Sequence, residues 1–148
     1  MSAARWIASG GGLGFFPFAQ GTVASAAAIV IGACALWLGH AVLAALIVVT
    51  FLVGLWAVHT VEDKSDPGWI VIDEFVGQWI ALLGLAHVHL LGLIAAFVLF
   101  RLFDITKLGP VGWADRRHDA VGVMADDAIA GLLAAAIVFV LGWLFPRL

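Results

Sequence analysis

The sequence predicts an all-α fold, a polytopic membrane helix bundle with about five transmembrane or membrane-embedded helices. Three observations predict it. Hydrophobic residues make up 64% of the 148 residues and charged residues only 11%, against roughly 45–50% and about 25% in soluble proteins. Residues 23–61 contain no Asp, Glu, Lys or Arg. No linker-like run of Pro, Ser or charge interrupts the chain, so we expect a single membrane-embedded domain over residues 1–148.

The helices are expected in three groups. About 20 apolar residues cross the hydrocarbon core, so the uncharged stretch holds two helices, near 23–38 and 41–61, with the break at Gly39-His40. A weakly charged stretch at 69–100, broken at 86–89, gives two more, and residues from about 122 to 145 give the fifth. Several of these helices are short, so we expect them to be tilted, packed inside the bundle or partly re-entrant.

The charged residues indicate which turns share one side of the membrane. All acidic residues lie within 62–74 and 101–127, whereas the turns at 39–40 and 86–89 carry no formal charge. If five helices cross in turn, the N-terminus and both acidic loops share one side. Six of the seven basic residues lie there, namely Arg5, Lys64, Arg101, Lys107, Arg116 and Arg117, and only Arg147 lies opposite. The positive-inside rule makes the shared side cytoplasmic.

Composition also excludes some functions. A net charge of −3 without a basic stripe argues against a nucleic-acid partner. Cys34 is the only cysteine, which excludes a disulfide framework and a cysteine-based metal site. We expect Cys34 to serve packing.

Five carboxylates mark the predicted cytoplasmic face. They come from three segments, "VIDEFVG" (Asp73, Glu74), "FRLFDITK" (Asp104) and "VMADDAIAG" (Asp126, Asp127). A charge at the bilayer centre costs about 2.5–3.5 kcal/mol even on a lenient scale, so a cation is the simplest balance. Oxygen ligands without a Cys or His set favour one or two Mg²⁺ ions, or Mn²⁺, and Mg²⁺ usually binds substrate phosphate as well.

The basic residues support a phosphorylated ligand. Arg101, Asp104 and Lys107 recur at i, i+3 and i+6, so on a continuing helix they share a face. An alternative interpretation is that the acids only mark helix starts, where the helix dipole favours negative charge. That alternative suits each acidic pair separately, but not Asp104, which is expected near a helix C-terminus.

Small residues lie behind the acids, at Gly77, Ala81 and Gly84 and at Gly131, Ala134 and Ala135. Such stripes allow membrane helices to approach closely, which would draw the carboxylates together. Exposed stripes would also suit a homodimer, although nothing selects one.

The Gly-rich segment "SGGGLGFFPFAQGTVAS" fits neither GxGxxG nor the Walker pattern. Its Thr22 and Ser25 either cap the first long helix or contact phosphate or metal directly. The sequence leaves both roles, helix capping and ligand contact, open for these two residues.

In these residues, the chain resembles the phosphatidylglycerophosphatase A family of bacterial membrane lipid phosphatases. The matching stretches are "GTVAS", "IVIDEFVGQWIAL", "FRLFDITK" and "GVMADDAIAG", in the family's order. The resemblance implies a multi-pass protein of the bacterial inner membrane, its active site facing the cytoplasm, that uses Mg²⁺ to hydrolyse phosphatidylglycerophosphate to phosphatidylglycerol and phosphate.

The resemblance also implies residue roles. Metal ligands would be Asp73, Glu74, Asp104, Asp126 and Asp127, and all of these except Asp126 are expected to be catalytic. Arg101 and Lys107 would contact phosphate, and Thr22 and Ser25 match polar positions of the family's N-terminal motif. Together with Arg116, which the resemblance does not assign, these are the expected substrate-binding residues.

Two other functions fit the acidic chemistry. An ion- or proton-coupled carrier would also place carboxylates in a membrane, but here they gather at one face and no convincing inverted repeat is visible. A metal-dependent phospholipid-head transferase would need a nucleotide-activated donor and would release a nucleotide in place of free phosphate.

Overall fold

A computed structural model describes residues 1–61 and 68–145 of the chain. Within them it contains α-helices, one 3-10 turn and no strand, so the predicted all-α class is confirmed. The elements are α1 (Ala3–Ala8), η1 (Leu13–Phe15), α2 (Gln20–Leu38), α3 (His40–Val61), α4 (Ile72–Leu82), α5 (Leu90–Thr106), α6 (Pro110–Asp115) and α7 (Ala120–Leu144). Lys64 and Arg147, which entered the prediction of sidedness, lie outside the described residues.

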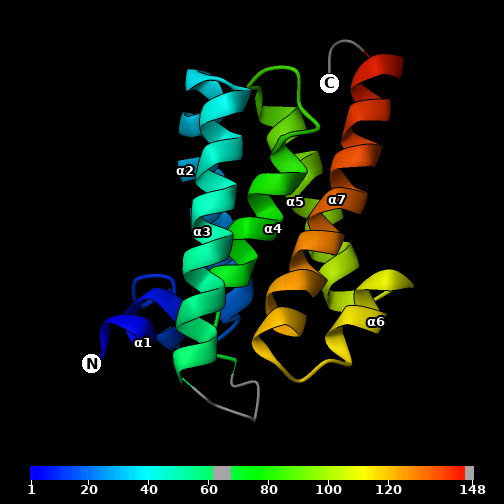
Figure 1. Cartoon of the computed structure of the whole chain (residues 1–148). Coiled ribbons are helices and arrows are strands. Elements are labelled where there is room, and N and C mark those ends of the chain that lie inside the picture. The colour runs from blue at the N-terminus through cyan, green and yellow to red at the C-terminus, as the bar shows by residue number, and fades with distance from the viewer. Residues whose placement is uncertain (62–67, 146–148) are drawn as a thin grey trace.

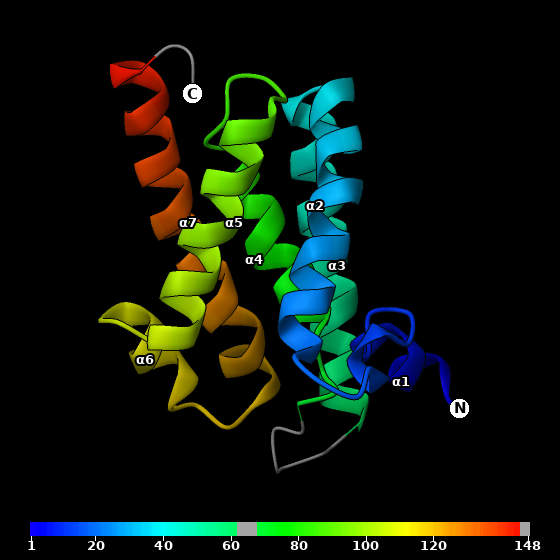
Figure 2. The ribbon, with the colours of Figure 1, turned by 180° about the vertical axis from the view of Figure 1, so that it is seen from behind.

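The long helices run alternately up and down one axis of the bundle, with α4 between them (Figures 1 and 2). The turn between α2 and α3 and the loop between α4 and α5 lie at one end. The short helices α1 and α6 lie at the other end, together with the starts of α2, α4 and α7. The segments that were predicted to share one side of the membrane therefore lie at one end of the molecule.

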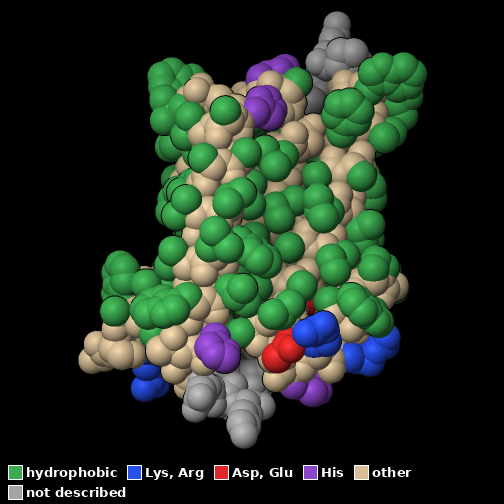
Figure 3. Space-filling model, viewed as in Figure 1, with side chains coloured by type: hydrophobic (Ala, Val, Ile, Leu, Met, Phe, Trp, Pro, Cys, Tyr) green, Lys and Arg blue, Asp and Glu red, His purple; other side chains and the backbone are tan. Residues whose placement is uncertain are grey.

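Among the described residues, three helices, α2, α3 and α7, are long and apolar enough to cross a membrane. The outer surface agrees, because apolar side chains cover most of the length of the face in Figure 3 while Lys, Arg, Asp and Glu gather at the end where α1 and α6 lie. Cys34 is exposed on α2, so the expectation that it packs inside the chain is wrong.

The helix α4 is the centre of the bundle. It has 11 residues, or about 16 Å at 1.5 Å per residue, which is about half of the hydrocarbon thickness. All of its residues except Asp73 are buried, and α2, α3, α5 and α7 all pack against it. Protein, and not lipid, therefore surrounds the helix that carries Asp73 and Glu74.

Glycines set the distance between α4 and α7, as the small-residue stripes predicted. A Cβ atom built on Gly77 would lie 2.6 Å from the backbone carbonyl oxygen of Asp127, and one on Gly131 would collide with the carbonyl oxygen of Gly77. A Cβ on Gly84 would collide with the backbone of Ala135 in the same way. These stripes are used within the chain, and the homodimer stays a prediction.

Candidate active site

A polar pocket of about 290 Å³ opens at the end of the bundle where the charged residues gather. Its walls come from the first turn of α2, the start of α4, the end of α5 and the second turn of α7. The residues that line it are Ala19, Gln20, Gly21, Thr22, Gly68, Ile70, Val71, Asp73, Glu74, Arg101, Asp104, Lys107, Val123, Asp126 and Asp127.

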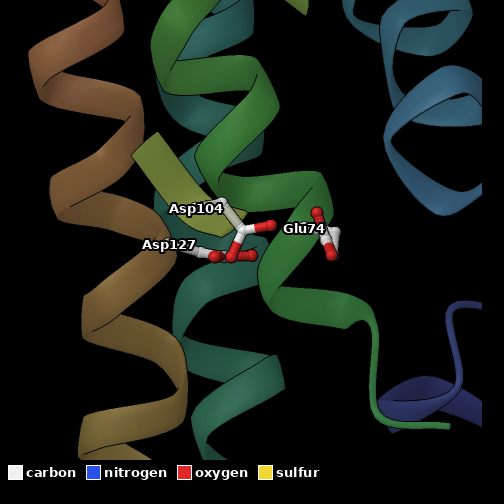
Figure 4. Close-up of side chains that lie close together, drawn as sticks. All are labelled: Glu74, Asp104 and Asp127. Carbon is white, nitrogen blue, oxygen red and sulfur yellow. The ribbon is translucent and has the colours of Figure 1, made fainter. Parts of the chain in front are cut away.

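Three carboxylates from three helices converge in this pocket. Glu74 stands in the first turn of α4, Asp104 near the end of α5, and Asp127 well inside α7 (Figure 4). One oxygen of each lies within 4.8 Å of the others, and the three residues are only 2–8% exposed. The helix-start interpretation fits Glu74 but fails for Asp127, because α7 begins seven residues earlier, at Ala120.

Arg101 joins two of these carboxylates. Its Nη1 donates to Oε2 of Glu74 at 2.5 Å and to Oδ2 of Asp104 at 2.6 Å. Oε2 of Glu74 also accepts a hydrogen bond of 2.7 Å from the hydroxyl of Ser25. Glu74 is therefore fixed from α2 and α5 at once, and its position depends on both helices.

Lys107 adds a second cation at the rim of the pocket. The helix α5 ends at Thr106 and Lys107 has left-handed backbone angles (φ 48°), so the expected continuing helix through Lys107 is wrong. The left-handed residue turns the chain, and Nζ lies 2.6 Å from Oδ2 of Asp126 and 3.0 Å from Oδ1 of Asp104. Burial lowers the pKa of Lys107, but Asp126 and Asp104 raise it more, so Lys107 stays protonated at neutral pH.

The balance of charge favours a divalent cation. Five carboxylates line the pocket, whereas Arg101 and Lys107 are the two cationic residues among those that line it. Full ionisation leaves three uncompensated negative charges in a largely buried site. The donor atoms are carboxylate oxygens, which suit Mg²⁺, Mn²⁺ or Ca²⁺ better than zinc or copper. The residues present therefore fit a metal ion of this class.

Most of the residues predicted from the sequence come together here. The five acids, both bases and Thr22 line the pocket. Ser25 lies behind it and is fully buried. Neither Thr22 nor Ser25 caps α2, because the helix begins after Ala19 without a side-chain cap, so the capping interpretation is wrong. Arg116 is exposed after α6 and is not among the lining residues.

Two residues that shape the pocket were not predicted from the sequence. Asp115 lies 3.5 Å from Nζ of Lys107, and nothing in the spacing within the chain indicated this contact. Gly21 allows α2 to approach Glu74, because a Cβ there would collide with Oε1 of Glu74. Its place one helical turn before Ser25, on the same face of α2, was the available signal.

Together, the fold and the pocket define a helical membrane protein with a buried, carboxylate-lined pocket at one end that can hold a metal ion. The chain belongs to the phosphatidylglycerophosphatase A family, whose sequence profile matches residues 6–142. The resemblance seen in the four motifs is thereby confirmed.

Two of three similar proteins carry the name of this family, and the third is named for a different lipid phosphatase. The chain is 35% identical to phosphatidylglycerophosphatase A of Escherichia coli K12 over 144 residues, covering 95% of this chain and 84% of that protein. The protein of the same name from Haemophilus influenzae Rd is 36% identical over 138 residues, covering 90% and 85%. A Bacteroides thetaiotaomicron protein provisionally named a phosphatidylinositol-3-phosphatase is 38% identical over 146 residues, covering 93% and 92%. No solved structure shows a significant match.

Proposed function

We propose that this protein is a phosphatidylglycerophosphatase that hydrolyses the phosphomonoester of phosphatidylglycerophosphate to phosphatidylglycerol and phosphate. Besides family membership, the position of the pocket supports this activity. The acids of the family-like motifs and two bases surround a single pocket at the end of an apolar bundle. A lipid headgroup emerges at that level of a membrane protein, so the pocket suits a phosphate that is attached to a lipid.

In the proposed reaction, the basic residues of the pocket bind the phosphate and the acidic residues bind the metal ion. Arg101 and Lys107 hold the phosphoryl oxygens and stabilise the charge that develops on them, since phosphoryl transfer depends mainly on positioning and electrostatics. Glu74, Asp104 and Asp127 would hold a metal ion, with Asp73 and Asp126 beside them. One or two Mg²⁺ ions bound there would polarise the phosphate and lower the pKa of a water molecule. A carboxylate of the cluster would accept the proton of the attacking water as its oxygen bonds to phosphorus. The P–O bond to the glycerol oxygen would break, and that oxygen would leave as the hydroxyl group of phosphatidylglycerol after taking up a proton.

Phosphate release by the purified protein tests the proposal. We expect release from phosphatidylglycerophosphate with Mg²⁺, partial replacement by Mn²⁺, and loss on adding EDTA. Asp73→Asn and Asp127→Asn should each lower kcat strongly. Arg117→Gln is the matched control, because it also removes one charge but is exposed and contacts Asp119 outside the pocket. Full activity in either Asn variant would remove that residue from the mechanism.

The same assay separates the competing functions. A phosphatidylinositol monophosphate belongs in the substrate panel because of the name of the Bacteroides relative. Release of a nucleotide from an activated donor would indicate a head transferase, and ion flux in liposomes without lipid turnover would indicate a carrier. Chemical cross-linking of the purified protein tests the homodimer.

We further propose that the pocket faces the cytoplasm from a bacterial inner membrane. Arg5 lies in α1, and Arg116 and Arg117 directly follow α6, and both helices lie at the pocket end (Figure 1). The positive-inside rule assigns such an end to the cytoplasm. Arg116→Cys in a Cys34→Ala background provides one thiol for labelling. An impermeant maleimide should label inverted vesicles and leave intact cells unlabelled, and the opposite pattern would reverse the orientation.

A further inference from the structure

Gln78 is a polar residue in the middle of α4 with no evident role in packing. Its side chain is fully buried, and neither Nε2 nor Oε1 has a hydrogen-bond partner in the described part of the chain. Gln78 lines neither the acidic pocket nor the apolar pocket at the opposite end of the bundle. An amide in this position costs stability when it is unpaired, so its presence needs a reason.

Arg101 provides a matching group. Its Nε is the third buried side-chain atom without a partner in the described residues, although Nη1 of the same side chain holds both Glu74 and Asp104. Nε–H can only donate, and the Oε1 of an amide can only accept. The two unpaired groups are therefore complementary.

The helix geometry places both groups on the same side of the ion pair. Gln78 follows Glu74 by four residues, so it lies on the same face of α4, about 6 Å deeper in the bundle. The helix α5 runs in the opposite direction, from the far end toward the pocket (Figure 2). Arg101 reaches along it to Asp104, so its Nε, which precedes Nη1 in the side chain, is on the deeper side as well.

We infer that Gln78 is a positioning residue for Arg101, joined to its Nε–H through one ordered water molecule, since the two side chains make no direct hydrogen bond. A buried water typically makes about three hydrogen bonds, and the two amide atoms and Nε–H supply that number. Glu74 and Asp104 hold the outer edge of the guanidinium, and Gln78 holds its inner edge. Two points of attachment fix the plane of the group, whereas one would let it rotate.

The predicted effect on kcat rests on the proposed function, whereas the contact between Gln78 and Arg101 does not. Since displacement of a positioned group by a remote change can cost up to about 100-fold, Gln78→Met should lower kcat by about 10- to 100-fold. Met has a similar shape and removes the hydrogen bonds. Ile80→Met on the same helix is the matched control for a general disturbance of α4 and should retain nearly full activity.

A double-mutant cycle tests whether Gln78 acts through Arg101. Arg101→Lys keeps the positive charge and removes Nε–H, so adding Gln78→Met to it should cause no further loss. An equal loss in both backgrounds would overturn the inference, as would a Gln78→Met protein as active as Ile80→Met.

A spectroscopic measurement tests the interaction between Gln78 and Arg101 without an activity assay. In a ¹⁵N–¹H spectrum of the protein in micelles, the Arg101 Nε–H signal is assigned by its loss in Arg101→Lys. We expect it to shift and to exchange faster with water in Gln78→Met, but not in Ile80→Met. An unchanged signal would refute the contact, whether or not the protein proves to be a phosphatase.

Discussion

The close approach of α4 and α7 at Gly77 makes a strong prediction. Gly77→Ala places a methyl group 2.6 Å from the carbonyl oxygen of Asp127 and against the ring of Phe100, so the two helices must separate. Gly142→Ala, on α7, meets nothing within 4 Å and is the matched control. Both changes gain helix propensity, about 1 kcal/mol in a helix interior, so that gain largely cancels in the comparison.

The magnitude follows from the packing. Forcing extra atoms into a well-packed core costs about 1–3 kcal/mol, and 1 kcal/mol corresponds to about 2–4 °C in Tm for a chain of this size. Gly77→Ala should therefore melt about 2–12 °C below Gly142→Ala. Because α4 carries Glu74 and α7 carries Asp127, we also expect the Mg²⁺ concentration for half-maximal activity to rise by about 10-fold.

Thermal melts followed by circular dichroism in detergent, and Mg²⁺ titrations of phosphate release, measure the two effects. Equal melting temperatures and equal Mg²⁺ requirements in the two variants would show that the glycine contact does not hold the carboxylates together. A lower Tm with an unchanged Mg²⁺ requirement would confine the contact to stability.

Three further predictions concern single residues. Ser25→Ala removes the hydrogen bond to Glu74. Since hydrogen bonds to charged groups contribute about 1.5–3 kcal/mol, both Tm and kcat should fall. An unchanged kcat would mean that Arg101 alone positions Glu74. Ala19→Gly should raise stability by about 1 kcal/mol, because Ala19 has a φ of 49° that glycine adopts without strain; an unchanged or lower Tm would contradict this. The pKa of Asp119 is lowered by hydrogen bonds from Arg117 and from the backbone N–H of Gly122, so its stabilisation of α7 is present above the ordinary Asp pKa and is lost as pH falls through the lowered one. Asp119→Ala should therefore lower Tm at pH 7 and have less effect at low pH, and an effect independent of pH would show that the charge is not involved.

The sequence predicted the gathering of the acids because membrane physics restricts where charge can lie. Segments that carry Asp73, Asp104 and Asp127 cannot enter the hydrocarbon far, so alternating helices must bring them to one end. The small residues near them predicted the close packing for a similar reason, since only small side chains allow backbones to touch. The spacing of three residues predicted that Arg101 and Asp104 share one face of α5, and their ion pair confirms this.

The contacts between helices could not be predicted in the same way. Arg101 also binds Glu74, which is 27 residues away, and Lys107 reaches Asp126 only because α5 ends in a left-handed residue that the apolar pattern does not reveal. Thr22 and Ser25 resembled helix caps because α2 was expected to begin near residue 23, whereas it begins at Gln20. The depth of burial of α4 was hidden as well, because the sequences of α2, α3, α5 and α7 are largely apolar too.

That buried helix has a consequence for biogenesis. A segment as short as α4, with two acids in its first turn, inserts poorly into a membrane by itself. It packs against α7, which comes last among the described helices. The pocket would then be completed only after α7 has been synthesised and inserted, so nascent chains at the translocon would lack an assembled metal site.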